Sequence, residues 1–141
     1  MSPTHKRYFT QWAAQFYAAA ELTRRGYLVS LTLGNAPEAD LIVRSPGDKL
    51  FEVDVKGLAS TNPWLIQERP ARPDLYFVLV HLPPLDDAPE FFIASSEEIM
   101  NAIAAYRERY VASGKEWPPS VSGLTWKMGL KYANRWQALP P

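Results

Sequence analysis

The chain has 141 residues, of which 47% are hydrophobic, and its 15 Lys and Arg residues balance its 15 Asp and Glu residues. That length fits one domain, and the composition excludes a disordered or collagen-like protein. Because the chain has no cysteine, disulfide scaffolds, thiol nucleophiles and thiolate metal sites are excluded as well. The net charge of zero argues against indiscriminate coating of nucleic acid, but an acidic metal centre can offset a basic rim in a nuclease.

No apolar run reaches the roughly 18 residues that a membrane span needs. The basic start at Met1–Arg7 is not followed by the apolar segment of a secretory signal, so we expect a cytoplasmic protein. The two histidines, His5 and His81, stand far apart in the sequence, and a histidine-rich metal site or a Ser/His/Asp triad therefore has little support.

The first predicted element is a helix over Tyr8–Arg25. The sequence favours Thr10 as its N-cap, with a start nearer Thr4 as the alternative. Gly26 suits the C-terminal cap. Four residues share one face of this helix at helical spacing: Trp12, Gln15, Ala19 and Leu22.

Three strands are predicted next, over Tyr27–Leu33, Ala39–Arg44 and Leu50–Lys56, with turn signals at Gly34–Pro37 and Ser45–Asp48. The Ser45–Asp48 turn favours a hairpin between the second and third strands. In the third strand apolar and charged residues alternate, which places three charged side chains on one face: Glu52, Asp54 and Lys56.

The second half of the chain begins with a long irregular segment, Gly57–Asp74. A strand buried on both faces follows at Leu75–Leu82, then a short strand at Glu90–Ala94 and a helix that is capped by Ser95 or Ser96 and extends to about Val111. We expect residues 115–141 to wrap the domain, with an edge strand near Leu124–Lys127. This order predicts one α/β domain over residues 1–141, in which helices flank a central mixed sheet.

Three side chains form the candidate chemical site: Asp40, Asp54 and Lys56. If the second and third strands pair, Asp40 lies opposite Val53 or Asp54, and the two carboxylates become neighbours. Their repulsion is offset by a hard divalent cation such as Mg²⁺, while a lysine can orient an attacking water or stabilise developing charge. The alternative interpretation is a solvated strand face with an ion pair across it.

The segments Ala20–Tyr27, Ala39–Val43 and Phe51–Gly57 together resemble the PD-(D/E)xK nuclease superfamily. The similarity is greatest to small Holliday-junction-resolvase-type and bacterial restriction-endonuclease-like proteins. It implies a restriction-endonuclease-like core and a DNA-cleaving site that depends on Mg²⁺, with Mn²⁺ able to substitute. In such a site Asp40, Asp54 and the Val55 backbone carbonyl would bind the metal, and Lys56 would assist the nucleophile.

Two positions depart from the pattern of this superfamily. Ala39 stands where proline often precedes the first aspartate, and Gln15 stands where many relatives carry a glutamate. A role of Gln15 in the site and a role as a buried structural polar residue both stay open. Glu21 is spaced i, i+4 from Arg25 and is interpreted as a surface pair.

Other residues have simpler interpretations: His81 is structural, Trp64 packs over the sheet, and Glu38 is a loop charge. Seven cations are candidates for a phosphate-facing rim: His5, Lys6, Arg7, Arg24, Arg25, Arg69 and Arg72.

The sequence therefore predicts a metal-dependent endonuclease that hydrolyses phosphodiester bonds in DNA. A homodimer or a protein partner is expected to assist it, because no separate recognition domain is visible. The alternative is a catalytically degenerate module of the same fold that binds nucleic acid or a protein partner.

Overall fold

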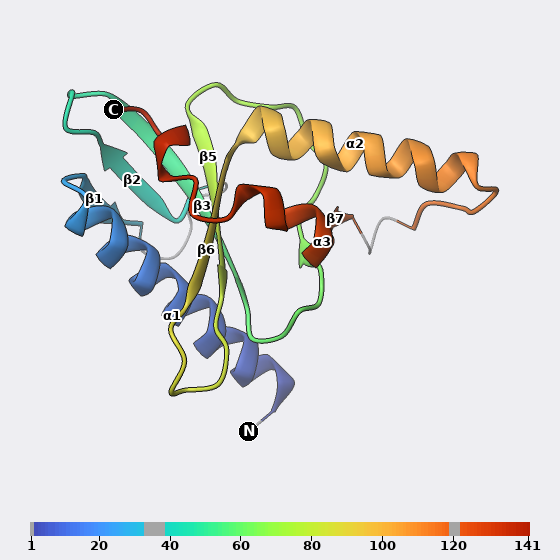
Figure 1. Cartoon of the computed structure of the whole chain (residues 1–141), viewed down its shortest axis with the longest axis horizontal. Helices are drawn as coiled ribbons and strands as arrows, with labels where there is room; N and C mark the ends of the chain where they lie inside the picture. Colours follow the sequence, from blue (N-terminus) through green and yellow to red (C-terminus); the bar gives the residue numbers. More distant parts are fainter. Residues whose placement is uncertain (1, 33–38, 119–121) are drawn as a thin grey trace.

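A computed structural model of the chain describes residues 2–32, 39–118 and 122–141. Its centre is a mixed sheet of five strands in the order β1-β2-β3-β5-β6. The strands β3 and β5 are parallel, and every other neighbouring pair is antiparallel. Figure 1 shows α1 and α2 on opposite sides of this sheet. The predicted mixed sheet with flanking helices is thus confirmed, as an α+β arrangement.

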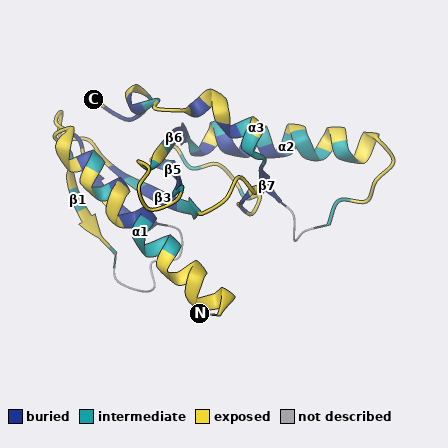
Figure 2. Cartoon of the chain, turned by 60° about the horizontal axis from the view of Figure 1, so that its bottom comes forward, coloured by how far each residue is buried: buried dark blue, intermediate teal, exposed yellow. Residues whose placement is uncertain are grey.

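The helix α1 (Pro3–Arg24) starts near Thr4, as the alternative prediction has it, and the favoured N-cap Thr10 is wrong. Its N-cap is Ser2, whose Oγ accepts a hydrogen bond from the His5 backbone N–H at 3.2 Å, and Pro3 occupies the first turn. The first two turns are exposed (Figure 2), so they carry no apolar periodicity by which the start could be predicted. Gly26 ends the helix with a φ of +91°, a conformation that favours glycine.

The predicted meander is present as β1 (Leu28–Leu31), β2 (Leu41–Arg44) and β3 (Leu50–Leu58). The turn between β2 and β3 is closed by a hydrogen bond from the Asp48 backbone N–H to the Ser45 carbonyl at 2.9 Å. The predicted turn at 34–37 and the loop residue Glu38 lie outside the described residues.

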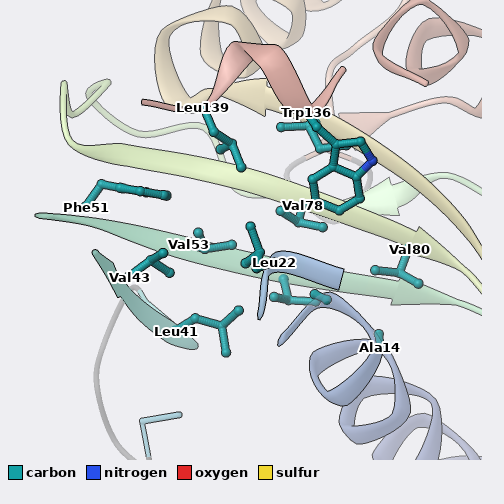
Figure 3. Packing of buried hydrophobic residues seen from close by; sticks show 13 residues of the cluster. Ala14, Leu22, Leu41, Val43, Phe51, Val53, Val78, Val80, Trp136 and Leu139 are labelled. Atoms are coloured by element: carbon teal, nitrogen blue, oxygen red, sulfur yellow. The ribbon is translucent and has the colours of Figure 1, made fainter. Parts of the chain in front are cut away.

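The two faces of the sheet form two cores. On one face α1 and the C-terminal residues cover the sheet, as Figure 3 shows for Leu22 beside Val53 and for Trp136 beside Val78. The other face packs against α2 (Ser96–Ala112) through residues of β5 (Leu75–His81), β6 (Glu90–Ser95) and α2 itself: Leu75, Phe77, Leu79, Phe92, Ile99 and Ile103.

Strand β3 takes part in both faces because its side chains alternate. Phe51, Val53 and Val55 belong to the core beneath α1. Asp54 pairs in register with Phe77, whose side chain belongs to the other core. The three charged side chains of β3 therefore face the side of the sheet that α2 and the segment 59–74 cover.

The segment between β3 and β5 contains a short strand, β4 (Trp64–Leu65), that the sequence does not predict. It pairs with β7 (Gly123–Leu124). The expected edge strand near Leu124–Lys127 is wrong beyond Leu124, since Thr125 caps the short helix α3 (Trp126–Gly129) by accepting a hydrogen bond from the Met128 N–H. Capping by threonine outweighs strand propensity at this position.

Residues near the C-terminal end, Trp136 and Leu139 among them, pack against the sheet. They form two turns of 3₁₀-helix, η2 (Leu130–Tyr132) and η3 (Trp136–Ala138). The hydroxyl of Tyr27 donates a hydrogen bond to the Pro140 carbonyl at 2.7 Å, which ties this end of the chain to the start of the sheet. In the described ranges we find no helix with both the length and the apolar character that a bilayer crossing requires.

Candidate active site

The fold brings Asp40 and Asp54 to neighbouring positions. The ladder between β2 and β3 ends at the pair Leu41–Val53, so Asp40, one residue before Leu41, lies at the position opposite Asp54. The Asp40 backbone N–H donates to the Val53 carbonyl at 2.9 Å, which holds this residue against β3. The expected juxtaposition of the two acids is therefore present in the backbone.

The carboxylate of Asp40 already has two hydrogen-bond partners. Its Oδ2 accepts from the Val55 backbone N–H at 2.7 Å, and its Oδ1 accepts from Nε2 of Gln15 at 3.3 Å. Burial raises the pKa of Asp40, and the negative charge of Asp54 raises it further, against the opposing effects of the Val55 N–H and the Lys56 ammonium.

Gln15 is both a buried polar residue and a neighbour of the candidate site, the two roles that the sequence left open. Its side chain is buried on α1, with 8% of the residue exposed, and it reaches the candidate ligand Asp40 directly. Glutamine supplies an amide hydrogen where a glutamate would place a second negative charge. Gln15 therefore orients Asp40 without adding charge to the site.

A second glutamine, Gln11, supports the same strand and was not singled out from the sequence. Strand β3 extends past the end of β2, which leaves the edge of its backbone open beyond Asp54. The side chain of Gln11 closes this edge, since its Nε2 donates to the Val55 carbonyl at 2.7 Å and its Oε1 accepts from the Gly57 N–H at 3.2 Å. The spacing of Gln11 four residues before Gln15, on the same side of a helix, is the signal that could have identified it.

Asp54 is the more deeply buried of the two acids, with 7% of its side chain exposed. Its Oδ2 accepts a hydrogen bond from Nη2 of Arg69 at 3.1 Å, and its Oδ1 lies 3.3 Å from Nζ of Lys56. Oδ1 is buried and has no hydrogen-bond partner among the described residues. Lys56 remains 34% exposed, so its ammonium group connects the buried carboxylate with solvent.

The donor atoms fit a small, hard divalent cation. Asp40 and Asp54 contribute carboxylates, and the backbone carbonyl of Val55 lies at the same edge of β3, where it also accepts a hydrogen bond from Gln11. Within the described ranges no three acidic or histidine side chains gather, but Mg²⁺ is usually held by one or two carboxylates together with water. Oδ1 of Asp54 contacts only the Lys56 ammonium among the described residues and has no hydrogen-bond partner there, so it can offer a lone pair to such an ion.

Two arginines of the expected phosphate-facing rim have other partners. Arg69 pairs with Asp54, and Arg72 pairs with Glu52. Both come from the segment 59–74 that lies over this face of the sheet. Arg24 and Arg25 pair with Glu21, at 3.1 and 3.7 Å, which confirms the surface pair expected between Glu21 and Arg25.

Lys6 and Arg7 are the rim candidates that line a groove next to the site. This groove has a volume of about 430 Å³ and lies between α1 and the chain that directly follows Lys56. Gly57 permits the close approach of the two walls, because a Cβ at this position would lie 2.7 Å from the Ala14 Cβ and 3.0 Å from the Thr10 carbonyl oxygen. The remaining lining residues are Thr10, Gln11, Leu58, Ala59, Ser60 and Asn62.

The structural interpretations of two further residues are confirmed. His81 is buried, and its Nδ1 lies 2.7 Å from the Glu90 carboxylate across the pair of β5 and β6. Trp64 is 1% exposed and stacks on Trp126 with ring centroids 5.5 Å apart. Neither side chain is available as a base-stacking surface or as a ligand near Asp40.

Comparisons of the chain with protein-family models, with curated proteins and with solved structures each found no significant match. The case for any function therefore depends on the chemistry of the site itself.

Proposed function

We propose that this chain is a Mg²⁺-dependent nuclease that hydrolyses phosphodiester bonds in DNA, built on a restriction-endonuclease-like core. The observation that carries this proposal is the position of Asp40 opposite Asp54, with the Lys56 ammonium 3.3 Å from the Asp54 carboxylate. The order of the elements supports the same conclusion: α1 precedes the antiparallel meander β1 to β3, and β5 then pairs with β3 in parallel.

Each residue has a separate role in this proposal. Asp40, Asp54 and the Val55 carbonyl would hold Mg²⁺, with Mn²⁺ able to replace it. The bound ion supplies Lewis acidity toward a phosphate oxygen and activation of water. Lys56, held by Asp54 and partly exposed, donates hydrogen bonds to an attacking water or to the phosphate. Gln15 keeps the Asp40 carboxylate oriented.

The groove beside Lys56 supports a polyanionic substrate. Its lining includes Lys6 and Arg7 and contains no acidic side chain. Both cations lie in the first two turns of α1, where the helix dipole disfavours positive charge and no acidic residue compensates for it. A phosphate backbone in the groove would relieve this unfavourable arrangement. We expect a homodimer or a protein partner to complete the recognition of DNA.

The test is cleavage of DNA by the purified chain with Mg²⁺ or Mn²⁺. We expect Asp40→Asn, Asp54→Asn and Lys56→Ala each to lower the rate by roughly 100-fold or more, because each removes a group that contacts the metal or the reacting phosphate. Glu52→Gln is the matched control, since Glu52 lies on the same strand and face but pairs with Arg72. Parent-like cleavage by the three site variants would contradict the proposal.

One observation favours a second candidate, a degenerate module of the same fold that binds nucleic acid or a protein partner. The charge of Asp54 is already balanced by Lys56 and Arg69 without any metal ion. Calorimetric titration with Mg²⁺ and Mn²⁺ separates the two candidates. A nuclease site gives binding heat that Asp40→Asn abolishes, whereas a degenerate module gives no heat that depends on either carboxylate.

A further inference from the structure

A second groove lies between the C-terminal half of α2 and the helix α3. It has a volume of about 580 Å³, and its lining residues are Tyr106, Arg109, Tyr110, Thr125, Lys127 and Met128. A smaller hollow of about 210 Å³ shares Arg109, Lys127 and Met128 with it and adds Lys131. Figure 1 shows this half of α2 extending beyond the sheet, well away from β2. Because the two hollows share three lining residues, we treat them together and call them the α2–α3 groove.

The α2–α3 groove is positively charged. Arg109, Lys127 and Lys131 line it, and no acidic side chain is among its lining residues. In the described part of the chain none of these three cations forms an ion pair with a carboxylate. Three like charges along one groove repel one another, and an anionic chain with repeated charges would relieve this repulsion.

Two aromatic rings line the larger of the two hollows. Tyr106 and Tyr110 lie one helical turn apart, with ring centroids separated by 6.1 Å. Trp117 holds both rings by edge contacts, at centroid distances of 5.6 and 5.3 Å. The Lys115 ammonium lies over the Tyr110 ring, 5.4 Å from its centroid, and adds positive charge there, so the opposite face of this ring is the one available for stacking. The tyrosine rings are thus fixed in place before any ligand arrives.

We propose that the α2–α3 groove binds single-stranded nucleic acid. Cations spaced along a groove match the repeating phosphates of a strand, and fixed aromatic rings next to them match unpaired bases. An acidic peptide would use the cations but would leave the tyrosine rings without a stacking partner. The inference does not depend on the proposed nuclease function, because none of its residues belongs to the Asp40 site.

The test is fluorescence anisotropy of a labelled short oligothymidylate, measured with EDTA present so that no divalent ion or cleavage takes part. We expect Arg109→Ala and Lys127→Ala each to weaken binding on the order of fivefold and to lower the slope of log affinity against log salt by about 0.7. Both side chains are exposed, so the variants keep the fold. Lys49→Ala removes an exposed cation outside the groove and should leave binding unchanged.

A second arm tests the aromatic half of the groove. An abasic strand of the same length should bind at least about fivefold more weakly than the oligothymidylate, because it cannot stack on Tyr106 and Tyr110. Equal binding of the abasic strand, equal weakening by Lys49→Ala, or tighter binding of an acidic peptide would each overturn the proposal. A mononucleotide that binds as tightly as the oligonucleotide would overturn it too, since the groove would then hold one nucleotide rather than a strand. If the chain does not cleave DNA, the nuclease proposal fails, but the expected results of these binding measurements stay the same.

Discussion

At the scale of single residues, Asp40 serves the fold and the proposed site at once. Its carboxylate accepts the Val55 N–H, yet burial and the nearby charge of Asp54 raise its pKa above the ordinary value of 3.8. The folded protein therefore binds a proton at Asp40 more tightly than the unfolded chain does. It follows that the contribution of Asp40 to stability falls as pH rises from 3.8 through the raised pKa.

We predict that Asp40→Asn becomes more stable relative to the parent as pH rises through this window. The neutral amide escapes the cost of an ionised carboxylate beside Asp54 and retains an oxygen for the Val55 N–H. The measurement is the difference in free energy of unfolding between variant and parent, from denaturant titrations at several pH values. A difference that is flat or falls with pH would show that the ionised form of Asp40 is not disfavoured in the folded state.

Glu98 provides a control of opposite sign. Burial raises the pKa of Glu98, but hydrogen bonds from the Ser95 backbone and from Arg135 outweigh that effect and lower it below the ordinary value of 4.5. The stability that ionised Glu98 contributes is present above 4.5 and is lost as pH falls through the lowered pKa. Glu98→Gln should therefore become less stable relative to the parent as pH rises, in contrast to Asp40→Asn.

At the scale of elements, α1 positions the site by closing the open edge of β3. The strand continues past its partner β2, and Gln11 supplies the donor and the acceptor that a neighbouring strand would otherwise provide. A buried backbone N–H or carbonyl without a hydrogen-bond partner lowers the stability of the fold, so the Gln11 side chain stabilises the fold by pairing these groups.

We predict that Gln11→Ala lowers the free energy of unfolding by about 1–3 kcal/mol, because the Val55 carbonyl and the Gly57 N–H lose their partner. Gln137→Ala is the matched control: Gln137 is exposed, and its loss should change stability by less than about 0.5 kcal/mol. Urea unfolding of both variants measures the difference. Equal stabilities of the two would mean that water replaces Gln11 at the strand edge without cost.

At the scale of the whole molecule, residues from both ends of the chain complete one core. Trp136 is 8% exposed and packs with α1 and the sheet, while Arg25 lies over its ring at 4.4 Å from the centroid (Figure 3 shows the tryptophan). Trp117, in contrast, contacts rings on the projecting half of α2. Trp136 therefore belongs to a core of the molecule, whereas Trp117 packs outside both cores.

We predict that Trp136→Ala lowers the free energy of unfolding by about 3–5 kcal/mol, the cost typical of a large side chain removed from a core. Trp117→Ala should cost less than about 2 kcal/mol, because its contacts lie outside both cores. Thermal and urea unfolding compare the two variants. A larger loss for Trp117→Ala would show that the end of α2 folds as an essential part of the domain.

The elements of this fold could be predicted where local patterns are strong. The alternation of Leu50–Lys56, the turn at Ser45–Asp48 and the cap at Ser95 each carry a signal within a few residues, and each is present in the structure. The start of α1 is marked only by the capping pair Ser2 and Pro3, because its exposed turns lack periodicity. The pairing of β4 with β7 carries no local signal, because short strands depend on distant partners.

By itself, the sequence determined the candidates for the site and their order along the strands, because alternation on β3 and the hairpin turn are local properties of the chain. Only the tertiary structure decided which side chains meet these candidates. Arg69 contacts Asp54 because the segment 59–74 folds back over the sheet, and no local sequence pattern specifies that path. Gln11 contacts β3 because α1 packs where this strand extends beyond the end of β2. Contacts between residues far apart in the chain follow from packing, which depends on all the elements together.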